Sequence, residues 1–86
     1  MQEYKLKENK KICKILGNIV KTLSKDKRKS LVAYESDIPR SVIHYIMEGK
    51  KDPQLTTFCR LAIGLGKKPS ELMKLVEDNI NNDWEI

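Results

Sequence analysis

The stretch IPRSVIHYIMEGKK, residues 38–51, decides how the rest of the chain folds. Pro39 suits the first turn of a helix, because proline has no N–H to lose there, and Gly49 followed by Pro53 ends the helix. The stretch therefore predicts a helix over residues 39–48. The apolar stripe of this helix consists of Val42, Ile43, Ile46 and Met47. The remaining, outward surface carries Arg40, Ser41, His44, Tyr45 and Glu48.

The residues just before this helix predict a second short helix. Residues 29–36 place Val32 and Ala33 inward, and Asp37 follows where a tight turn needs a residue that tolerates a positive φ. Two short helices joined by such a turn form a helix-turn-helix.

Three further segments have helical periodicity. Residues 8–24 form the most regular one, and Gly17 within them costs roughly 1 kcal/mol relative to alanine, which suggests that a neighbouring helix packs closely there. Residues 55–64 and the segment from Pro69 onward predict two more helices, and no segment alternates as a strand does. The chain is therefore predicted to be all-α. Its predicted core is Ile15, Leu16, Ile19, Leu23, Val32, Ala33, Ile38, Ile43, Ile46, Phe58, Leu61, Ala62, Leu65 and Leu72.

Two motifs together resemble a known family. The segments DIPRSVIHYIMEGK (residues 37–50) and DPQLTTFCRLAIGLG (residues 52–66) resemble the lambda-repressor-like, Cro/repressor (XRE) DNA-binding family. The resemblance covers roughly residues 16–75. It implies a compact five-helix domain whose helix-turn-helix binds duplex DNA.

The resemblance also implies which residues touch DNA. It places residues 39–48 in the major groove, with Arg40, Ser41, His44 and Tyr45 as base-reading candidates. The second helix of this family has its N-terminus against a phosphate, where free N–H groups and the helix dipole favour an anion. The phosphate-contact candidates near this N-terminus are Lys27, Arg28 and Lys29. Lys50 and Lys51, after the helix of residues 39–48, are two more.

The chain departs from the family pattern at two positions of the second helix. The family usually has Ser or Thr near position 28 and an apolar residue near position 36, whereas this chain has Arg28 and Ser36. The helix is therefore expected either to begin later, with Ser30 as its cap, or to pack more loosely.

The charge of the chain is unevenly distributed. The net charge is +5, but residues 1–51 hold 13 Lys and Arg against 6 Asp and Glu, whereas residues 52–86 hold 4 against 6. The basic part carries the helix-turn-helix, so the asymmetry favours a polyanionic partner. The alternative is a lysine-rich surface that only keeps the protein in solution.

The sequence argues against enzymatic and metal chemistry. An 86-residue domain is too small for an internal cavity with catalytic machinery, and Ser41 with His44 lacks an orienting carboxylate. Cys13 and Cys59 are far apart and suit reduced, buried or half-buried thiols. With a single histidine and no zinc spacing, no metal or other cofactor is expected.

These observations predict a sequence-specific transcriptional regulator, a repressor that binds an inverted repeat as a homodimer. The same domain serves as the antitoxin of toxin–antitoxin pairs, so a protein partner is the nearest alternative, and a protein-interaction module without DNA contact is a third.

The predicted organisation is a flexible lead-in (residues 1–7), the DNA-binding domain (residues 8–76) and an acidic tail (residues 77–86). Trp84 and Ile86 in this tail either fold back on the core or dock on another subunit. Since no signal peptide or membrane-spanning segment is recognisable, the protein is expected to be cytoplasmic.

Overall fold

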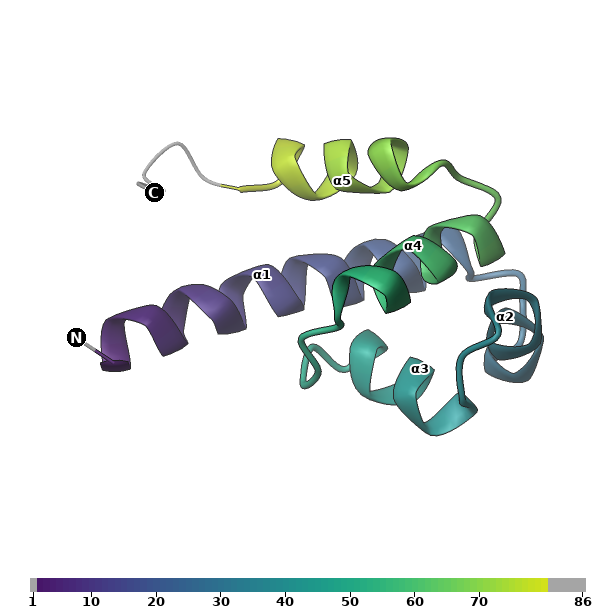
Figure 1. The fold of residues 1–86 in the computed structure, drawn as a ribbon, viewed down its shortest axis with the longest axis horizontal. Coiled ribbons are helices and arrows are strands. Elements are labelled where there is room, and N and C mark those ends of the chain that lie inside the picture. Colours follow the sequence, from purple (N-terminus) through teal and green to yellow (C-terminus); the bar gives the residue numbers. More distant parts are fainter. Residues whose placement is uncertain (1, 81–86) are drawn as a thin grey trace.

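Glycine and proline residues lie at or near both ends of the third and fourth helices and at the start of the fifth. A computed structural model describes residues 2–80, with side chains for residues 9–80. It contains α1 (Gln2–Leu23), α2 (Lys29–Ser36), α3 (Arg40–Met47), α4 (Leu55–Gly64) and α5 (Pro69–Asp78), and no strand occurs between residues 2 and 80 (Figure 1). The predicted all-α class and the number of helices are confirmed. Met1, Trp84 and Ile86 lie outside the described residues. Across residues 2–80, no helix has the length and apolarity needed to cross a membrane.

The first helix begins earlier than the periodicity of its apolar residues predicts. The helix was expected from about Glu8, but α1 starts at Gln2. Residues 2–7 contain neither glycine nor proline, and they include the good helix formers Gln, Glu, Lys and Leu. A helix that has formed gains one backbone hydrogen bond per added residue, so it extends through such a segment without an apolar stripe.

Gly17 marks the closest approach between α1 and α3. A Cβ atom on Gly17 would lie 2.7 Å from the carbonyl oxygen of Ile46 and 2.8 Å from that of Met47. Real Cβ atoms essentially never come so close to backbone atoms, so only glycine fits here without a shift of one helix. The predicted packing of a helix against the bare backbone of Gly17 is confirmed, and this contact fixes the C-terminal end of α3.

The second helix neither begins late nor packs loosely. It starts at Lys29, with Arg28 at the N-cap and no side-chain hydrogen bond from the cap, so Ser30 is not the cap. Ser36 is 2% exposed and lies against α4, where a Cβ atom on Gly64 would be 2.8 Å from the Ser36 Cβ. The absence of a side chain at Gly64 therefore leaves room for Ser36 at this buried position. Among the described residues, none forms a hydrogen bond with the hydroxyl of Ser36.

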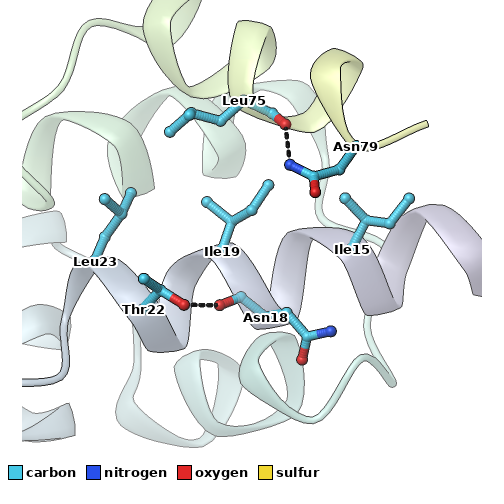
Figure 2. Close-up of a pocket in the computed structure, with 7 residues that line it drawn as sticks. All are labelled: Ile15, Asn18, Ile19, Thr22, Leu23, Leu75 and Asn79. Carbon is cyan, nitrogen blue, oxygen red and sulfur yellow. Dashed lines mark hydrogen bonds between the residues drawn. The ribbon is translucent and has the colours of Figure 1, made fainter.

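One hydrophobic core joins all five helices. It includes most of the predicted residues, and also Val20, Met47 and Val76; the full set is Leu16, Val20, Val32, Ala33, Ile38, Ile43, Ile46, Met47, Phe58, Leu61, Ala62, Leu65, Leu72 and Val76. Three predicted core residues, Ile15, Ile19 and Leu23, are only half-buried. They point from α1 toward α5 and line an open groove with Leu75 (Figure 2). The apolar stripe of α1 is wider than the surface that α3 and α5 cover.

The two cysteines have the predicted environments. Cys13 is buried, Cys59 is half-buried, and both are free thiols. Burial, with a smaller contribution from the charge of Asp52, raises the pKa of the Cys13 thiol. The neutral thiol of Cys13 therefore persists to higher pH than that of an exposed cysteine.

Candidate nucleic-acid interface

A short turn fixes α3 relative to α2. Asp37 has a φ of 58°, and the N–H groups of Asp37 and Ile38 donate to the carbonyl oxygens of Tyr34 (3.3 Å) and Ala33 (3.0 Å). This is the hydrogen-bond pattern that closes a helix on a left-handed residue. Ile38, at 5% exposure, anchors the turn in the core, and Pro39 follows as the N-cap of α3. The predicted role of Asp37 is confirmed, and the helix begins one residue after Pro39.

A second left-handed residue closes the other end of α3. Gly49 has a φ of 73°, its N–H donates to the Ile46 carbonyl (3.0 Å), and the N–H of Lys50 donates to the Tyr45 carbonyl (2.9 Å). A Cβ atom on Gly49 would lie 3.1 Å from the Cα of Lys14, so this turn also packs closely on α1. Lys50 and Lys51 therefore follow a rigid helix end.

The two faces of α3 separate as predicted. Ile43 and Ile46 are fully buried and Met47 is 6% exposed, whereas Tyr45 is 50% exposed. The other outward residues, Arg40, Ser41, His44 and Glu48, are also exposed, and Val42 of the apolar stripe is half-buried. Helical spacing explains the division, because residues separated by three or four positions lie on one face.

The four base-reading candidates share one open hollow on the protein surface. Its lining consists of Lys29, Arg40, Ser41, His44 and Tyr45, which we call the α3 hollow. The Nζ of Lys29, at the start of α2, lies 2.9 Å from the Nδ1 of His44. The rings of His44 and Tyr45 meet edge to face, with centroids 5.4 Å apart and planes at 63°. Residues from both short helices thus form one polar surface.

The five phosphate-contact candidates divide into three groups. Lys29 belongs to the α3 hollow, and exposed Arg28 precedes it at the N-cap of α2. The Nζ of Lys27 lies 2.8 Å from the Oε1 of Glu35, so this charge already has an internal partner. Lys50 and Lys51 are exposed at the far end of α3.

Two features of the surface could not be found from the sequence. Lys14 lies beside Gly49, which brings a third lysine to the end of α3 that carries Lys50 and Lys51. The contact between Lys29 and His44 joins residues fifteen positions apart. In both cases the angle between two helices determines the contact, and the helical periodicity of neither segment reports that angle.

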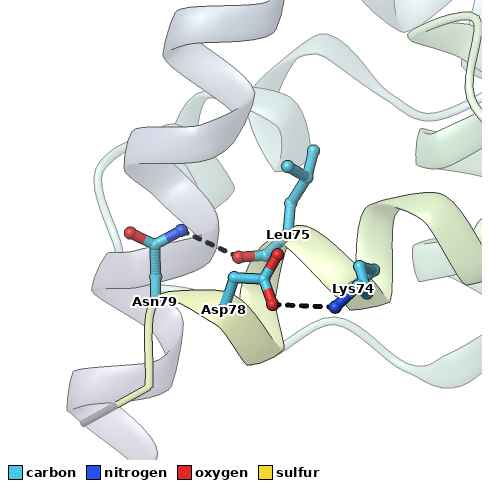
Figure 3. A network of polar contacts seen from close by, with 4 residues as sticks. All are labelled: Lys74, Leu75, Asp78 and Asn79. Atoms are coloured by element: carbon cyan, nitrogen blue, oxygen red, sulfur yellow. Dashed lines mark hydrogen bonds and ion pairs between the residues drawn. The ribbon is translucent and has the colours of Figure 1, made fainter.

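The surface away from the α3 hollow has a different character. In Figure 1, α1 and α4 separate α3 from α5. A hollow lined by largely apolar residues lies between α1, the start of α4 and α5, and includes Leu55 (75% exposed), Phe58 and Met73 (49% exposed). At the end of α5, Lys74 donates to Asp78 (3.1 Å), which raises the pKa of Lys74, and the Asn79 side chain donates to the Leu75 carbonyl (2.8 Å; Figure 3).

Among the side chains of residues 9–80, no group of three or more His, Cys, Asp and Glu residues is placed to hold a metal ion. Comparison of the chain with protein-family models, with curated proteins and with solved structures gave no match.

Proposed function

We propose that this protein is a sequence-specific duplex-DNA-binding regulator of transcription, and that it acts as a repressor. The observation that carries the proposal is the α3 hollow, where four exposed polar side chains of one helix meet a lysine from the start of the preceding helix. An α-helix fits the major groove of B-DNA, which is about 12 Å wide. The closely packed turns at Asp37 and Gly49 hold α3 rigidly enough to present a defined surface.

The side chains of α3 suit base edges. Arg40 can donate two hydrogen bonds to the O6 and N7 of guanine, and Ser41 can donate to a base or a phosphate. Tyr45 can donate through its hydroxyl or pack on a thymine methyl group, and His44 can donate to a base edge. In the proposed complex these four residues read the sequence.

The surrounding cations suit the DNA backbone. Arg28 and Lys29 lie at the N-terminus of α2, where free N–H groups also favour an anion. Lys50 and Lys51 lie beyond the other end of α3, so phosphates on both sides of the groove are within the proposed contact surface. Lys27 contributes less, because Glu35 already binds its ammonium group.

We further propose that the protein binds an inverted repeat as a homodimer. The exposed apolar side chains Leu55 and Met73, and the groove beside Leu75, lie on elements other than α3. Contact between copies through such surfaces leaves both α3 helices free for DNA. The same apolar surface favours one second candidate, an antitoxin that binds its toxin there while α3 stays on DNA.

The ammonium group of Lys29 beside the ring of His44 supports a binding protein over an enzyme. In a serine–histidine catalytic pair, an acidic or carbonyl group accepts a hydrogen bond from the second ring nitrogen. Here the Nδ1 of His44 faces the cationic Lys29 instead. The Ser41 and His44 pair therefore lacks the partner that would activate it.

Selection of bound duplexes from a random pool tests the proposal. We expect enrichment of one symmetric motif, and we expect the double variant Arg40→Ala, Tyr45→Ala to lose it. The matched control is Arg60→Ala, which removes an exposed guanidinium from α4 and should leave the motif unchanged. If no duplex is enriched even at low salt, the protein is not a sequence-specific DNA-binding protein. Purification of the native protein with its associated proteins then separates the antitoxin from the regulator acting alone.

A further inference from the structure

The hydrogen bond between Lys29 and His44 determines the position of a proton. A lysine ammonium group carries three N–H donors and has no lone pair to accept a hydrogen bond. Its Nζ lies 2.9 Å from the Nδ1 of His44, so Nδ1 must be the acceptor and must carry no proton. In the neutral ring the proton then resides on Nε2. A doubly protonated ring has no lone pair at Nδ1 and is incompatible with this contact.

We infer that Lys29 is a positioning residue, which fixes His44 as the tautomer that donates from Nε2 and thereby determines which base edge His44 reads. The inference rests on the proposed DNA-binding function and deepens it. Lys29 retains two further N–H groups, so it can hold the ring and still contact a phosphate. The edge-to-face contact with Tyr45 restrains the same ring from a second side.

The tautomer matters because the two forms of the ring read different bases. With the proton on Nε2, the free nitrogen of His44 is a donor and needs an acceptor on the base. The opposite tautomer would present a lone pair, which suits the N–H groups of cytosine N4 and adenine N6. Lys29 thus influences specificity without needing to touch a base.

The neighbouring side chain makes guanine the best match. Arg40 has five N–H donors and no acceptor, and it lies four positions before His44 on the same face of α3. In the major groove, guanine presents two acceptors, O6 and N7, and no donor. Adenine combines an acceptor with a donor, and cytosine presents only a donor. A surface of two adjacent donors therefore recognises guanine most completely.

Nuclear magnetic resonance of the ring nitrogens tests the positioning role without DNA. His44 is the single histidine, so its two nitrogen-15 signals need no assignment among residues. We expect, at about pH 8.5 where an ordinary imidazole is neutral, an Nε2 signal typical of a protonated nitrogen and an Nδ1 signal typical of an unprotonated one. Lys29→Met should move the two shifts toward each other, and Lys29→Arg, which keeps a donor, should retain the wild-type difference. A protonated Nδ1 in the wild type would overturn the inference. Two ring-nitrogen shifts in Lys29→Met that are unchanged from the wild type would also overturn it.

The reading role is tested on the duplex that the selection yields. Each guanine is replaced in turn by 7-deazaguanine, which lacks the N7 acceptor. We expect one replacement that weakens wild-type binding by about three- to tenfold, the range for one hydrogen bond. His44→Ala should be insensitive to that replacement, Lys29→Met less sensitive than the wild type, and Lys29→Arg as sensitive. If His44→Ala remains as sensitive as the wild type at every guanine, His44 does not read a purine N7.

The two experiments distinguish failure of the inference from failure of the proposed function. If no duplex is enriched, the reading role falls with the proposed function, while the ring spectra still decide whether Lys29 fixes the tautomer. If a duplex is enriched but the spectra show no effect of Lys29, DNA binding stands and the positioning role is wrong. Circular dichroism and thermal unfolding of each variant establish that the fold is intact; all the substituted side chains are exposed or half-buried.

Discussion

Arg40 and Arg60 offer a direct comparison between a proposed base-reading residue and a surface charge. Both are exposed, but Arg40 lines the α3 hollow whereas Arg60 lies on α4. Arg40→Ala should cost about 1–3 kcal/mol on the selected duplex and much less on a scrambled one, because only the former engages base edges. Arg60→Ala should change neither by a comparable amount. Titrations of both duplexes check this, and an equal loss on the two duplexes for Arg40→Ala would show that Arg40 reads no sequence.

Lys50 should behave as a phosphate contact. A lysine acts there as a point charge, so Lys50→Ala should weaken binding to all duplexes similarly and reduce the slope of log K against log salt by about 0.9. Lys27→Ala provides the contrast. Because the Nζ of Lys27 already lies 2.8 Å from the Oε1 of Glu35, this substitution should change the slope less. Binding measured at several salt concentrations gives both slopes. An unchanged slope for Lys50→Ala would place Lys50 away from the backbone.

Ser36 is a stability liability at a buried position. Its hydroxyl is buried without a hydrogen-bond partner in the described part of the chain, and a buried polar group in that state costs about 1–3 kcal/mol. Ser36→Ala removes the hydroxyl, adds no volume and improves helix propensity. We expect the free energy of unfolding in urea to rise by about 1 kcal/mol. A decrease would mean that the hydroxyl has a partner in solution, such as a bound water molecule.

The contact between α1 and α3 depends on one missing side chain. Gly17→Ala gains roughly 1 kcal/mol of helix propensity, but its Cβ would lie 2.7 and 2.8 Å from two carbonyl oxygens of α3. Both neighbours are backbone atoms, so α3 must move, and overpacking of this kind costs about 1–3 kcal/mol. We therefore expect a net loss of stability together with weaker DNA binding, because α3 carries the α3 hollow.

The adjacent residue supplies the control for this substitution. Asn18 is exposed on α1, so Asn18→Ala gains helix propensity without any clash and should leave stability unchanged or slightly higher. Urea unfolding of the two variants separates the effects. If Gly17→Ala is as stable as Asn18→Ala, the two helices do not approach as closely as the Gly17 contact requires.

The sequence patterns predicted which segments are helical better than they predicted which helix faces are covered by a neighbouring helix. Glycine and proline placed both ends of α3 to within one residue, both ends of α4, and the start of α5, since these residues act on the backbone locally. The predicted start of α1, at about Glu8, was wrong because residues 2–7 contain neither glycine nor proline to end the helix and no apolar stripe to indicate it. Ile15, Ile19 and Leu23 were expected in the core, but periodicity shows only that a face is apolar. Whether a neighbouring helix covers that face depends on the packing of α5, which no local pattern encodes.

In the candidate site, too, the sequence predicted the features that lie within one helix but not the contacts between segments. The exposure of the four base-reading candidates followed from helical spacing, because all four lie on the single helix α3. The bond between Lys29 and His44 could not be predicted, since it depends on the angle between two helices. The internal pairing of Lys27 with Glu35 was missed for a related reason: the two residues are eight positions apart, and the chain between them spans the end of the loop before α2 and most of that helix.

The dimensions of the whole molecule permit two copies on one face of the duplex. The described fold measures 38 × 23 × 22 Å, and half-sites of helix-turn-helix dimers lie about 34–36 Å apart, one helical turn. Two copies aligned by their shorter axes fit within that spacing. The surfaces on α1, α4 and α5 then remain for contact between the copies, on elements other than α3 (Figure 1).

The spacing of the half-sites therefore tests the proposed homodimer. Insertion of about 5 base pairs rotates one half-site by half a turn to the opposite face of the duplex, whereas about 10 base pairs restores the face. If two copies contact each other, the 5-base-pair insertion should abolish cooperative binding, and its affinity should fall to that of a single half-site. The 10-base-pair insertion controls for added length and should retain more of the affinity. Mobility shifts across the series, with the stoichiometry of each complex, provide the measurement. Equal affinity at every spacing would mean that monomers bind independently, in which case the homodimer is wrong and the reading of DNA by α3 is unaffected.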